Sequence, residues 1–500
     1  MSLRNHFTNV EEAASRHPSR VAFKIPQINT KTNEIQVDDI TYSQYLLDIE
    51  RIAAYWYHVL NDVAGIPQRS VIALCVEGYN RHFIPDAPYD LIGGAFESAK
   101  PRAFIFESLY KDSGAVRHAL IPCYEALPSV DVAYSDTEHP LPQLPTVEAE
   151  SIAIIVQTSG TSSGVSKVIP GSYRWLVDAK CRKASRLITA PSASPDRQDI
   201  YIRRGSIATE GSLCFSPLYL LTGPVPFSLK RQPTTSELVT LIQQCNINKV
   251  YQFPQLMETH LQAARVDPAI LSTFAGLDGL YYGGSSLCAS EEEWAAQNGI
   301  NLVNGYGSTE CGVLLISQGT RKDPRNLLRV HPGATLKFVP FTSHDLDGES
   351  GLLELVIPPE APECPDKSRR AEDGSFHTDD LFREVEPGAY VRCGRTGDWI
   401  NIKSSKGSKL CDTRGIENNA RELCGDIITG CVVIGEGRPS PVLIVESHSE
   451  NLEVLPAEIY SRIAPFHAAR YPFERIASQR MVITVTPGTL PRTAKGTIQR

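Results

Sequence analysis

The stretch SIAIIVQTSGTSSGVSK, residues 151–167, joins an apolar run to a loop rich in glycine and hydroxyl side chains. The β-branched residues of its first half predict a buried strand. In its second half, glycine lets backbone N–H groups approach an anion, and serine and threonine hydroxyls add donors. The Walker A pattern GxxxxGK[ST] cannot be placed on Gly160, Gly164 and Lys167. The stretch predicts a strand followed by a phosphate-binding loop, with an ordinary surface loop as the alternative.

The same alternation of strands and helical stretches continues along the chain. Apolar runs at 248–253 and 277–284 predict further strands, and a helix is expected through Trp175 and Leu176. Strands interleaved with helices are typical of an α/β fold with mixed, largely parallel sheets. Beyond about residue 395, shorter runs around one helix predict a small α+β unit. We therefore expect a large body over 1–396 and a small C-terminal cap over 397–500.

Composition narrows the class of protein further. The 500 residues are 42% hydrophobic, enough for a large core, and carry a net charge of −8. Nucleic-acid-binding proteins usually show a strong basic excess, so nucleic acid is not an expected partner. No stretch approaches ~18 uncharged apolar residues and no apolar signal segment is recognised, so we expect no membrane span and a cytoplasmic location. The twelve cysteines are expected to be buried thiols in a reducing compartment.

Three further segments carry side chains suited to nucleotide chemistry. In NGYGSTE, the ring of Tyr306 can stack on a base and the carboxylate of Glu310 can hold Mg²⁺. In FHTDD, Asp380 can accept both hydroxyls of a ribose, and Arg395 further on can reach the same sugar or a phosphate. Near the C-terminus, Lys495 can neutralise phosphate charge. The plainer alternatives are a strand end, an Asx cap and a solvated tail.

Together, the order and spacing of these segments resemble the adenylate-forming superfamily of acyl-CoA synthetases and nonribosomal-peptide (NRPS) adenylation domains. TSGTSSGVSK is similar to the family's phosphate loop TSGTTGxPK, and NGYGSTE to its NxYGxTE. HTDD with GRTGDWINIKSSKG resembles TGD and GRxDDxIKxxG, and LPRTAKGTIQR resembles the terminal PRTxxGK. The start, FTNVEEAASRHPSRVAF, is similar too, so the resemblance spans nearly the whole chain. The ending looks most like the adenylation domains of fungal NRPS-like carboxylic-acid reductases, enzymes of secondary metabolism.

The resemblance implies an enzyme that activates a carboxylic acid with ATP and Mg²⁺ to an acyl-adenylate, then passes the acyl group to a thiol. It implies that Glu310 holds Mg²⁺ and that Thr309 and Lys495 act at the α-phosphate, which makes these three the expected catalytic residues. Attack of a carboxylate on a phosphate needs cations that reduce their repulsion. The residues implied to bind ATP or AMP are Thr158, Ser159, Gly160, Thr161, Asn304, Tyr306, Gly307, Ser308, Thr309, Asp380 and Arg395.

Four positions depart from the family pattern. The lysine that usually follows the terminal glycine is Thr497, and Lys495 stands before that glycine. The hinge acid, two residues after the motif arginine, is Gly397, which can absorb large changes of φ and ψ, so we expect the mobile cap to pivot there. The glycine of TGD is Asp379, and the histidine common after PLF or PLY is Leu220. A non-catalytic nucleotide-binding module is the alternative that these departures leave open.

The segment FSPLYLLT, which matches the family's acid-binding region, and the aromatic residues elsewhere imply the pocket for the acid. Domains that activate α-amino acids usually place an aspartate there, and this segment has no acidic residue. A buried α-amine would be unpaired, at a cost of roughly several kcal/mol. We expect an aryl or other apolar acid, with a betaine held by cation–π contacts as an alternative. The expected pocket residues are Phe215, Tyr219, Leu220, Phe253, Tyr281, Tyr282, Gly283 and Gly312.

The expected acyl acceptor is the phosphopantetheine thiol of a carrier-protein domain, with a reductase domain acting next. No separate carrier or reductase domain is recognised in this sequence. A stand-alone acyl- or aryl-CoA ligase that uses free CoA is therefore the alternative to a domain of a carboxylic-acid reductase.

Overall fold

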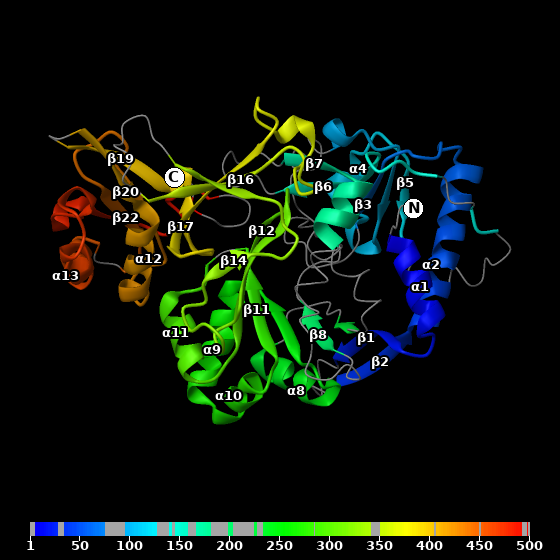
Figure 1. Ribbon diagram of the computed structural model, residues 1–500, viewed down its shortest axis with the longest axis horizontal. Coiled ribbons are helices and arrows are strands. Elements are labelled where there is room, and N and C mark those ends of the chain that lie inside the picture. The colour runs from blue at the N-terminus through cyan, green and yellow to red at the C-terminus, as the bar shows by residue number, and fades with distance from the viewer. Residues whose placement is uncertain are drawn as a thin grey trace. The chain divides into compact units, whose positions relative to one another are not determined.

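The computed structural model describes residues 6–28, 35–75, 96–127, 140–142, 146–158, 167–181, 199–203, 225–227, 234–284, 286–341, 351–404, 407–449, 452–492 and 498. The chain divides into two compact units, each described by itself below (Figure 1). The first takes in residues 1–158, 166–335 and 360–370, and the second 159–165, 336–359 and 371–500. Parallel strands interleaved with helices confirm the predicted α/β class. A cap that begins at residue 397 stays a prediction.

A mainly parallel sheet forms the centre of the first unit. Its strands run in the order β14-β13-β12-β11-β10-β8-β9-β1-β2, and those from β12 to β1 are parallel to one another. Strands β10 and β11 fall in the two apolar runs that predicted them. The bounds are β1 Val21–Ile28, β2 Ile35–Thr41, β8 Ile200–Arg203, β9 Val225–Phe227, β10 Lys249–Gln252, β11 Gly279–Gly283, β12 Leu302–Ser308, β13 Gly312–Ser317 and β14 Leu328–Val330.

Four helices supply the apolar side chains that cover one face of this sheet (Figure 1). Leu238 and Met257 from the helices and Leu280 from β11 are fully or almost fully buried in the same core cluster. Helix α8 begins in a capping box, in which Thr234 and Glu237 satisfy each other's backbone N–H groups. The helices are α8 Thr235–Cys245, α9 Pro254–Val266, α10 Pro268–Ala275 and α11 Ala289–Gln297.

Two smaller sheets complete the first unit. β3, β4 and β5 are parallel, whereas β6 and β7 form an antiparallel pair, so the strand predicted at 151–158 exists but lies outside the large sheet. The helix expected at Trp175 is the π-helix η3. The bounds are α1 His6–Arg16, α2 Tyr42–Tyr57, η1 His58–Val63, β3 Ile72–Cys75, β4 Ala103–Phe106, η2 Ser108–Tyr110, α4 Gly114–Arg117, β5 Cys123–Glu125, β6 Ile152–Thr158, β7 Lys167–Ser172, η3 Trp175–Cys181 and η4 Lys367–Arg369.

The second unit combines an antiparallel meander, a hairpin and a small mixed sheet. The meander is β15-β16-β17-β18, the hairpin is β19-β20, and the small sheet has the order β21-β22-β23. Helices α12 and α13 pack with this small sheet in one core cluster, as the predicted α+β unit requires. The bounds are β15 Lys337–Pro340, β16 Leu353–Ile357, β17 Phe376–Glu386, β18 Ala389–Arg395, η5 Thr396–Asp398, β19 Trp399–Ser404, β20 Gly407–Asp412, α12 Thr413–Cys424, β21 Gly430–Ile434, β22 Val442–Glu446, α13 Leu455–Ala468, η6 Pro472–Glu474, η7 Gln479–Met481 and β23 Val482–Val485.

The cysteines agree in part with the prediction of buried thiols. All ten that the structure describes are free, and seven of them are buried. The other three, Cys123, Cys288 and Cys393, are half-buried.

Polar side chains close the amino edge of the parallel sheet in the first unit. Asn248 donates to Asp199 (2.7 Å) and to Asp278 (2.8 Å), and the Lys249 ammonium lies 2.5 Å from Asp199. Asn301, which precedes β12, donates to the Asp278 carbonyl at 2.7 Å. We call these five residues the amino-edge network. Because Lys249 and Asp199 are both buried, the ion pair is shielded from water and salt.

This ion pair predicts a stability effect. Lys249→Met leaves the Asp199 carboxylate buried without its ammonium partner, so we expect the free energy of unfolding to fall by about 3 to 5 kcal/mol in denaturant titrations. Lys24→Met is the matched control, because Lys24 pairs at 2.7 Å with an Asp39 side chain that is 46% exposed; its effect should stay below about 1 kcal/mol. Equal effects of the two substitutions would contradict the assignment.

Candidate active site

The carboxyl ends of β10, β11 and β12 lie at the edge of the parallel sheet opposite the amino-edge network. Open α/β sheets bind their ligands outside this edge. Here β11 ends at Gly283, and the next residue, Gly284, has φ 87 with open space where a Cβ would stand. At the end of β11, backbone atoms rather than side chains therefore line the carboxyl edge.

Close backbone approaches fix the positions of three strands at this edge. A Cβ on Gly283 would lie 2.4 Å from the carbonyl oxygen of Gly305, its partner residue on β12. A Cβ on Gly307 would lie 2.3 Å from the carbonyl oxygen of Gly312 on β13, and Gly312 itself has φ 73. Only glycine permits such approaches. The bare backbone that results suits a planar base or a phosphate.

Asn304 and Tyr306 lie two residues apart on β12, and therefore share a face of that strand. The backbone N–H of Asn304 donates to the Ser317 hydroxyl of β13 at 2.8 Å. Tyr306 pairs with Leu315 across the β12–β13 ladder and is buried. Both candidate adenine-binding residues are thus held by β13.

The turn between β12 and β13 carries Thr309 and Glu310, both half-buried. The N–H of Cys311 donates to the Ser308 carbonyl and hydroxyl, each at 3.2 Å. The carbonyl of Glu310 accepts a hydrogen bond of 2.8 Å from the indole N–H of Trp175. The sequence did not predict this contact of Trp175 with the turn, because the two residues are 135 positions apart along the chain.

An aromatic group lies on the face of the sheet opposite the helices. Tyr281 stacks on Tyr251 with ring centroids 4.5 Å apart, and Tyr201 meets Tyr251 edge-on at 6.1 Å. Burial raises the pKa of Tyr281, with a smaller contribution from nearby carboxylates. Phe253, at the start of α9, is 51% exposed. For Phe253, Tyr281, Gly283 and Gly312, the expected place in the acid pocket stays a prediction.

Tyr282 points to the other side of β11, into the core under the helices. Its hydroxyl donates to the Glu292 carboxylate of α11, and Asn326 donates to both groups at 3.0 Å. This placement argues against Tyr282 as a wall of the acid pocket. Burial raises the pKa of Glu292 to about 7, although the Asn326 hydrogen bond opposes the shift.

Asp380 and Arg395 are brought together in the second unit, as partners across β17 and β18. The Asp380 side chain is buried, and its Oδ1 accepts from Arg395 at 3.4 Å. Arg392 lies closer, with its terminal nitrogen 2.5 Å from the same oxygen. Sequence reasoning missed Arg392, whose position two residues before the GRTGD motif was the available signal. Asp379 takes the glycine-like φ of 59, which aspartate tolerates better than most residues.

Gly397 lies in η5, the short turn between β18 and β19. No atom lies within 4 Å of the position that a Cβ on Gly397 would occupy. Its neighbour Asp398 accepts from the Arg395 N–H at 2.8 Å and pairs with Arg414 at 3.6 Å. The carbonyl of Asp398 accepts from the Thr413 hydroxyl at 2.6 Å. Asp398 therefore ties this turn to its surroundings, whereas Gly397 beside it adds no side-chain contact.

The C-terminal motif is anchored on β22. Glu446 is fully buried, accepts from the Leu490 N–H at 2.8 Å and pairs with the Arg492 guanidinium. Burial alone would raise the pKa of Glu446, but these bonds hold it below its usual value. Arg492 and Ile498 also form an antiparallel bridge. Gly430 faces this anchor, and a Cβ there would meet both Arg492 and Glu446 within 3 Å.

Several predicted site residues lie outside the part of the chain that can be described. These are the side chain of Thr158 and residues Ser159, Gly160, Thr161, Phe215, Tyr219, Leu220 and Lys495. Their roles stay predictions from the resemblance.

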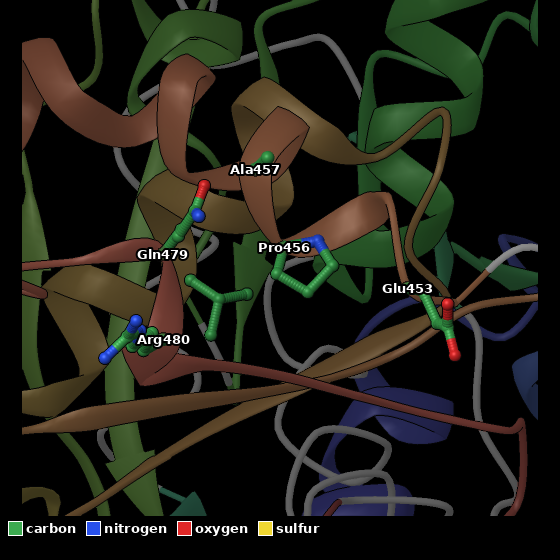
Figure 2. Close-up of a pocket in the computed structure, with 6 residues that line it drawn as sticks. Glu453, Pro456, Ala457, Gln479 and Arg480 are labelled. Atoms are coloured by element: carbon green, nitrogen blue, oxygen red, sulfur yellow. The ribbon is translucent and has the colours of Figure 1, made fainter.

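Within the described ranges, no three His, Cys, Asp or Glu side chains are grouped closely enough to hold a metal ion, and no helix has both the length and the apolar character of a membrane span. A hollow of about 270 Å³ lies on the second unit, and Figure 2 shows Glu453 and Arg480 on opposite sides of it. It contains none of the implied site residues; its lining is Glu453, Pro456, Ala457, Gln479, Arg480 and Val482.

Comparison with known proteins gives the family. A family model of AMP-binding enzymes matches residues 90–345, and one of the AMP-binding enzyme C-terminal domain matches 402–500. An AMP-binding domain-containing enzyme of Amanita muscaria, iboA, is 29% identical over 98% of this chain and 98% of its own length. An adenylate-forming reductase of Serpula lacrymans is 24% identical over 70% of this chain, but only 32% of its own length. An anthranilate–CoA ligase of Pseudomonas aeruginosa is 25% identical over 43% of this chain and 42% of its own length.

Solved structures show the same fold. MatB from Rhodopseudomonas palustris with bound ATP has a TM-score of 0.75 at 18% identity, over 100% of this chain and 97% of that one. The o-succinylbenzoate CoA synthetase of Bacillus subtilis, in complex with its acyl-adenylate intermediate, has a TM-score of 0.73 at 11% identity, over 98% and 96%.

The chain belongs to the AMP-binding enzyme family and is an adenylate-forming ligase. Within that class, it matches nearly the whole of the Amanita enzyme and about a third of the reductase.

The half-buried Glu292 predicts a pH-dependent stability. Its folded-state pKa of about 7 lies above the ordinary value of 4.5, so the folded protein holds an extra proton between these pH values. The stability that this group contributes is therefore lost as pH rises through 7. At pH 8, Glu292→Gln should raise the melting temperature, because the neutral amide avoids the cost of the charged carboxylate, by the equivalent of up to about 3 kcal/mol. The gain should shrink towards pH 5.

Glu293→Gln, at the exposed neighbouring position of α11, is the control for this comparison. A difference between Glu292→Gln and the natural protein that does not change with pH would show that Glu292 is not protonated in the fold.

Proposed function

We propose that the protein activates a carboxylic acid without an α-amine to its acyl-adenylate, using ATP and Mg²⁺, and transfers the acyl group to a phosphopantetheine thiol. The observation that carries this proposal is the glycine-lined carboxyl edge of the sheet, from which the Thr309–Glu310 turn projects on the β12–β13 hairpin. Bare backbone, a hydroxyl and a carboxylate next to one another are what a nucleotide with its metal ion requires.

In the first unit, Asn304 and Tyr306 take the adenine and Thr309 the α-phosphate. Glu310 holds Mg²⁺, a hard cation that usually keeps one or two carboxylates and shares the phosphate oxygens of its substrate. Mg²⁺ supplies the charge that allows an anionic carboxylate to approach the phosphate.

In the second unit, the Asp380 carboxylate accepts the ribose hydroxyls. Arg392 and Arg395 hold that carboxylate from one side through Oδ1, which fixes its orientation. Lys495 bridges the attacking carboxylate and the α-phosphate, and the anchor of Arg492 on Glu446 restrains the chain next to it.

The nature of the acid follows from the sequence of one segment and from an aromatic residue at the carboxyl edge. The segment 215–222 has no acidic residue that could pair with an α-amine. Phe253, directly after β10, exposes an aromatic ring at the carboxyl edge. An aryl or other apolar acid is therefore the proposed substrate class.

The acceptor is proposed to be a carrier-bound thiol that feeds a reductase. The match to an adenylate-forming reductase of Serpula lacrymans supports it. A stand-alone CoA ligase is the second candidate, because the anthranilate–CoA ligase matches a similar share of both chains.

The function is tested by incubating the protein with ATP, Mg²⁺, hydroxylamine and a panel of aryl, aliphatic, betaine and α-amino acids. We expect pyrophosphate and hydroxamate with an aryl or apolar acid, and none with α-amino acids. Supplying either free CoA or a phosphopantetheinylated carrier domain then identifies the acceptor. Nucleotide binding without pyrophosphate release for any acid would indicate a non-catalytic module.

The proposed role of Lys495 predicts a split between binding and chemistry. Lys495→Ala should reduce the rate of adenylation by ~10²- to 10³-fold, because one electrostatic donor at the reacting atoms is lost. ATP binding, measured by calorimetry, should change far less. Arg480→Ala removes a positive charge from the hollow on the same unit and serves as the control. An unchanged adenylation rate for Lys495→Ala would remove this lysine from the site.

The proposed pivot predicts unequal effects on the two half-reactions. Gly397→Pro fixes φ near −65° and should impair either pyrophosphate exchange or thioester formation much more than the other. Gly397→Ala is the matched control, because the space around the position accepts a Cβ. Equal losses in both half-reactions, or no loss, would place the pivot elsewhere.

A further inference from the structure

Trp175 connects two parts of the first unit that are far apart in sequence. Its side chain is 4% exposed and packs in a core cluster with Val156 of β6 and Ile169 of β7. Its indole N–H leaves this cluster to donate to the Glu310 carbonyl at 2.8 Å. The residue thus joins the β6–β7 pair to the turn that carries Thr309 and Glu310.

The local sequence is built to hold this indole in place. The backbone N–H of Trp175 donates to the Ser172 hydroxyl at 3.1 Å, which fixes the start of the helical segment. A Cβ on Gly171 would lie 2.4 Å from two carbon atoms of the indole ring. Glycine at position 171 therefore makes the space that the ring fills.

The bond acts on the backbone of the residue that is proposed to bind Mg²⁺. With its carbonyl fixed by the indole, Glu310 has less freedom to rotate about its own backbone, so its carboxylate samples fewer directions. Groups that orient a metal ligand typically change metal affinity or activity by about 10- to 100-fold when they are removed. A core tryptophan without this bond would affect only stability.

We propose that Trp175 is a positioning residue for Glu310, which sets the Mg²⁺ affinity of the site through the indole–carbonyl hydrogen bond. The inference rests on the proposed function of Glu310 as the Mg²⁺ ligand. It adds a residue outside the motifs of the family resemblance, and it assigns to the β6–β7 pair a share in metal binding.

The test measures Mg²⁺ affinity without turnover. Melting temperature is followed as Mg²⁺ is added at a fixed, saturating concentration of the non-hydrolysable α,β-methylene-ATP, and the half-saturating Mg²⁺ concentration is recorded. Trp175→Phe keeps an aromatic ring but removes the N–H donor, and should raise that concentration about 10-fold. Pyrophosphate release at saturating Mg²⁺ should fall much less than at low Mg²⁺.

Three further variants make the result decisive. Gly171→Ala keeps the indole but displaces it, and should raise the Mg²⁺ requirement as Trp175→Phe does. Trp294→Phe, on α11 under Arg265, and Gly276→Ala, at the end of α10, are the matched controls and should leave the requirement unchanged. If Trp175→Phe does not fold, Gly171→Ala decides the question alone.

Glu310→Gln separates the inference from the function on which it rests. If Glu310→Gln raises the Mg²⁺ requirement while Trp175→Phe and Gly171→Ala lower only the melting temperature, Trp175 is structural and the inference is overturned. If Glu310→Gln leaves the Mg²⁺ titration unchanged, the proposed metal role of Glu310 is wrong and the inference falls with it. Parallel shifts in all three variants support both.

Discussion

The contact between the backbones of β11, β12 and β13 is the constraint on which the candidate site depends. The strands can approach as they do only because Gly283 and Gly307 have no Cβ that would strike a neighbouring carbonyl. That approach sets the position of β12, and with it the positions of Tyr306 and the turn that bears Glu310. The positions of the polar side chains in the candidate site thus depend on how closely the strand backbones can pack.

In the second unit, buried ion pairs have the same ordering role. Asp380 and Glu446 are both buried, and each is bound to an arginine of a sequence motif, Arg395 and Arg492 respectively. A buried carboxylate has no water to replace a lost partner, so each pair resists rearrangement strongly. The chemistry expected of Asp380 requires an oriented carboxylate, and the anchor at Glu446 restrains the chain near the terminal motif.

The sequence predicted the α/β class and the strands at β6, β10 and β11, because β-branched runs between turn residues are strong local signals. It placed Asp380 and Arg395 in one site, which their cross-strand pairing supports. It did not separate Tyr281 from Tyr282, since a strand buried on both faces shows no alternation of polarity. Trp175 and Arg392 were missed because their roles depend on a distant contact and on a β-bulge between β17 and β18.

The two edges of the parallel sheet in the first unit differ in the residues that they carry. The amino-edge network ties strand to strand through buried, charged and amide side chains. At the carboxyl edge, glycines set how closely the strands approach, and the side chain of Phe253 is exposed. Evolution can therefore exchange an exposed side chain at the carboxyl edge, such as that of Phe253, without loosening the strands beneath it. A protein built in this way can change its substrate through exposed side chains at one edge of the sheet, while the network at the other edge keeps the sheet folded.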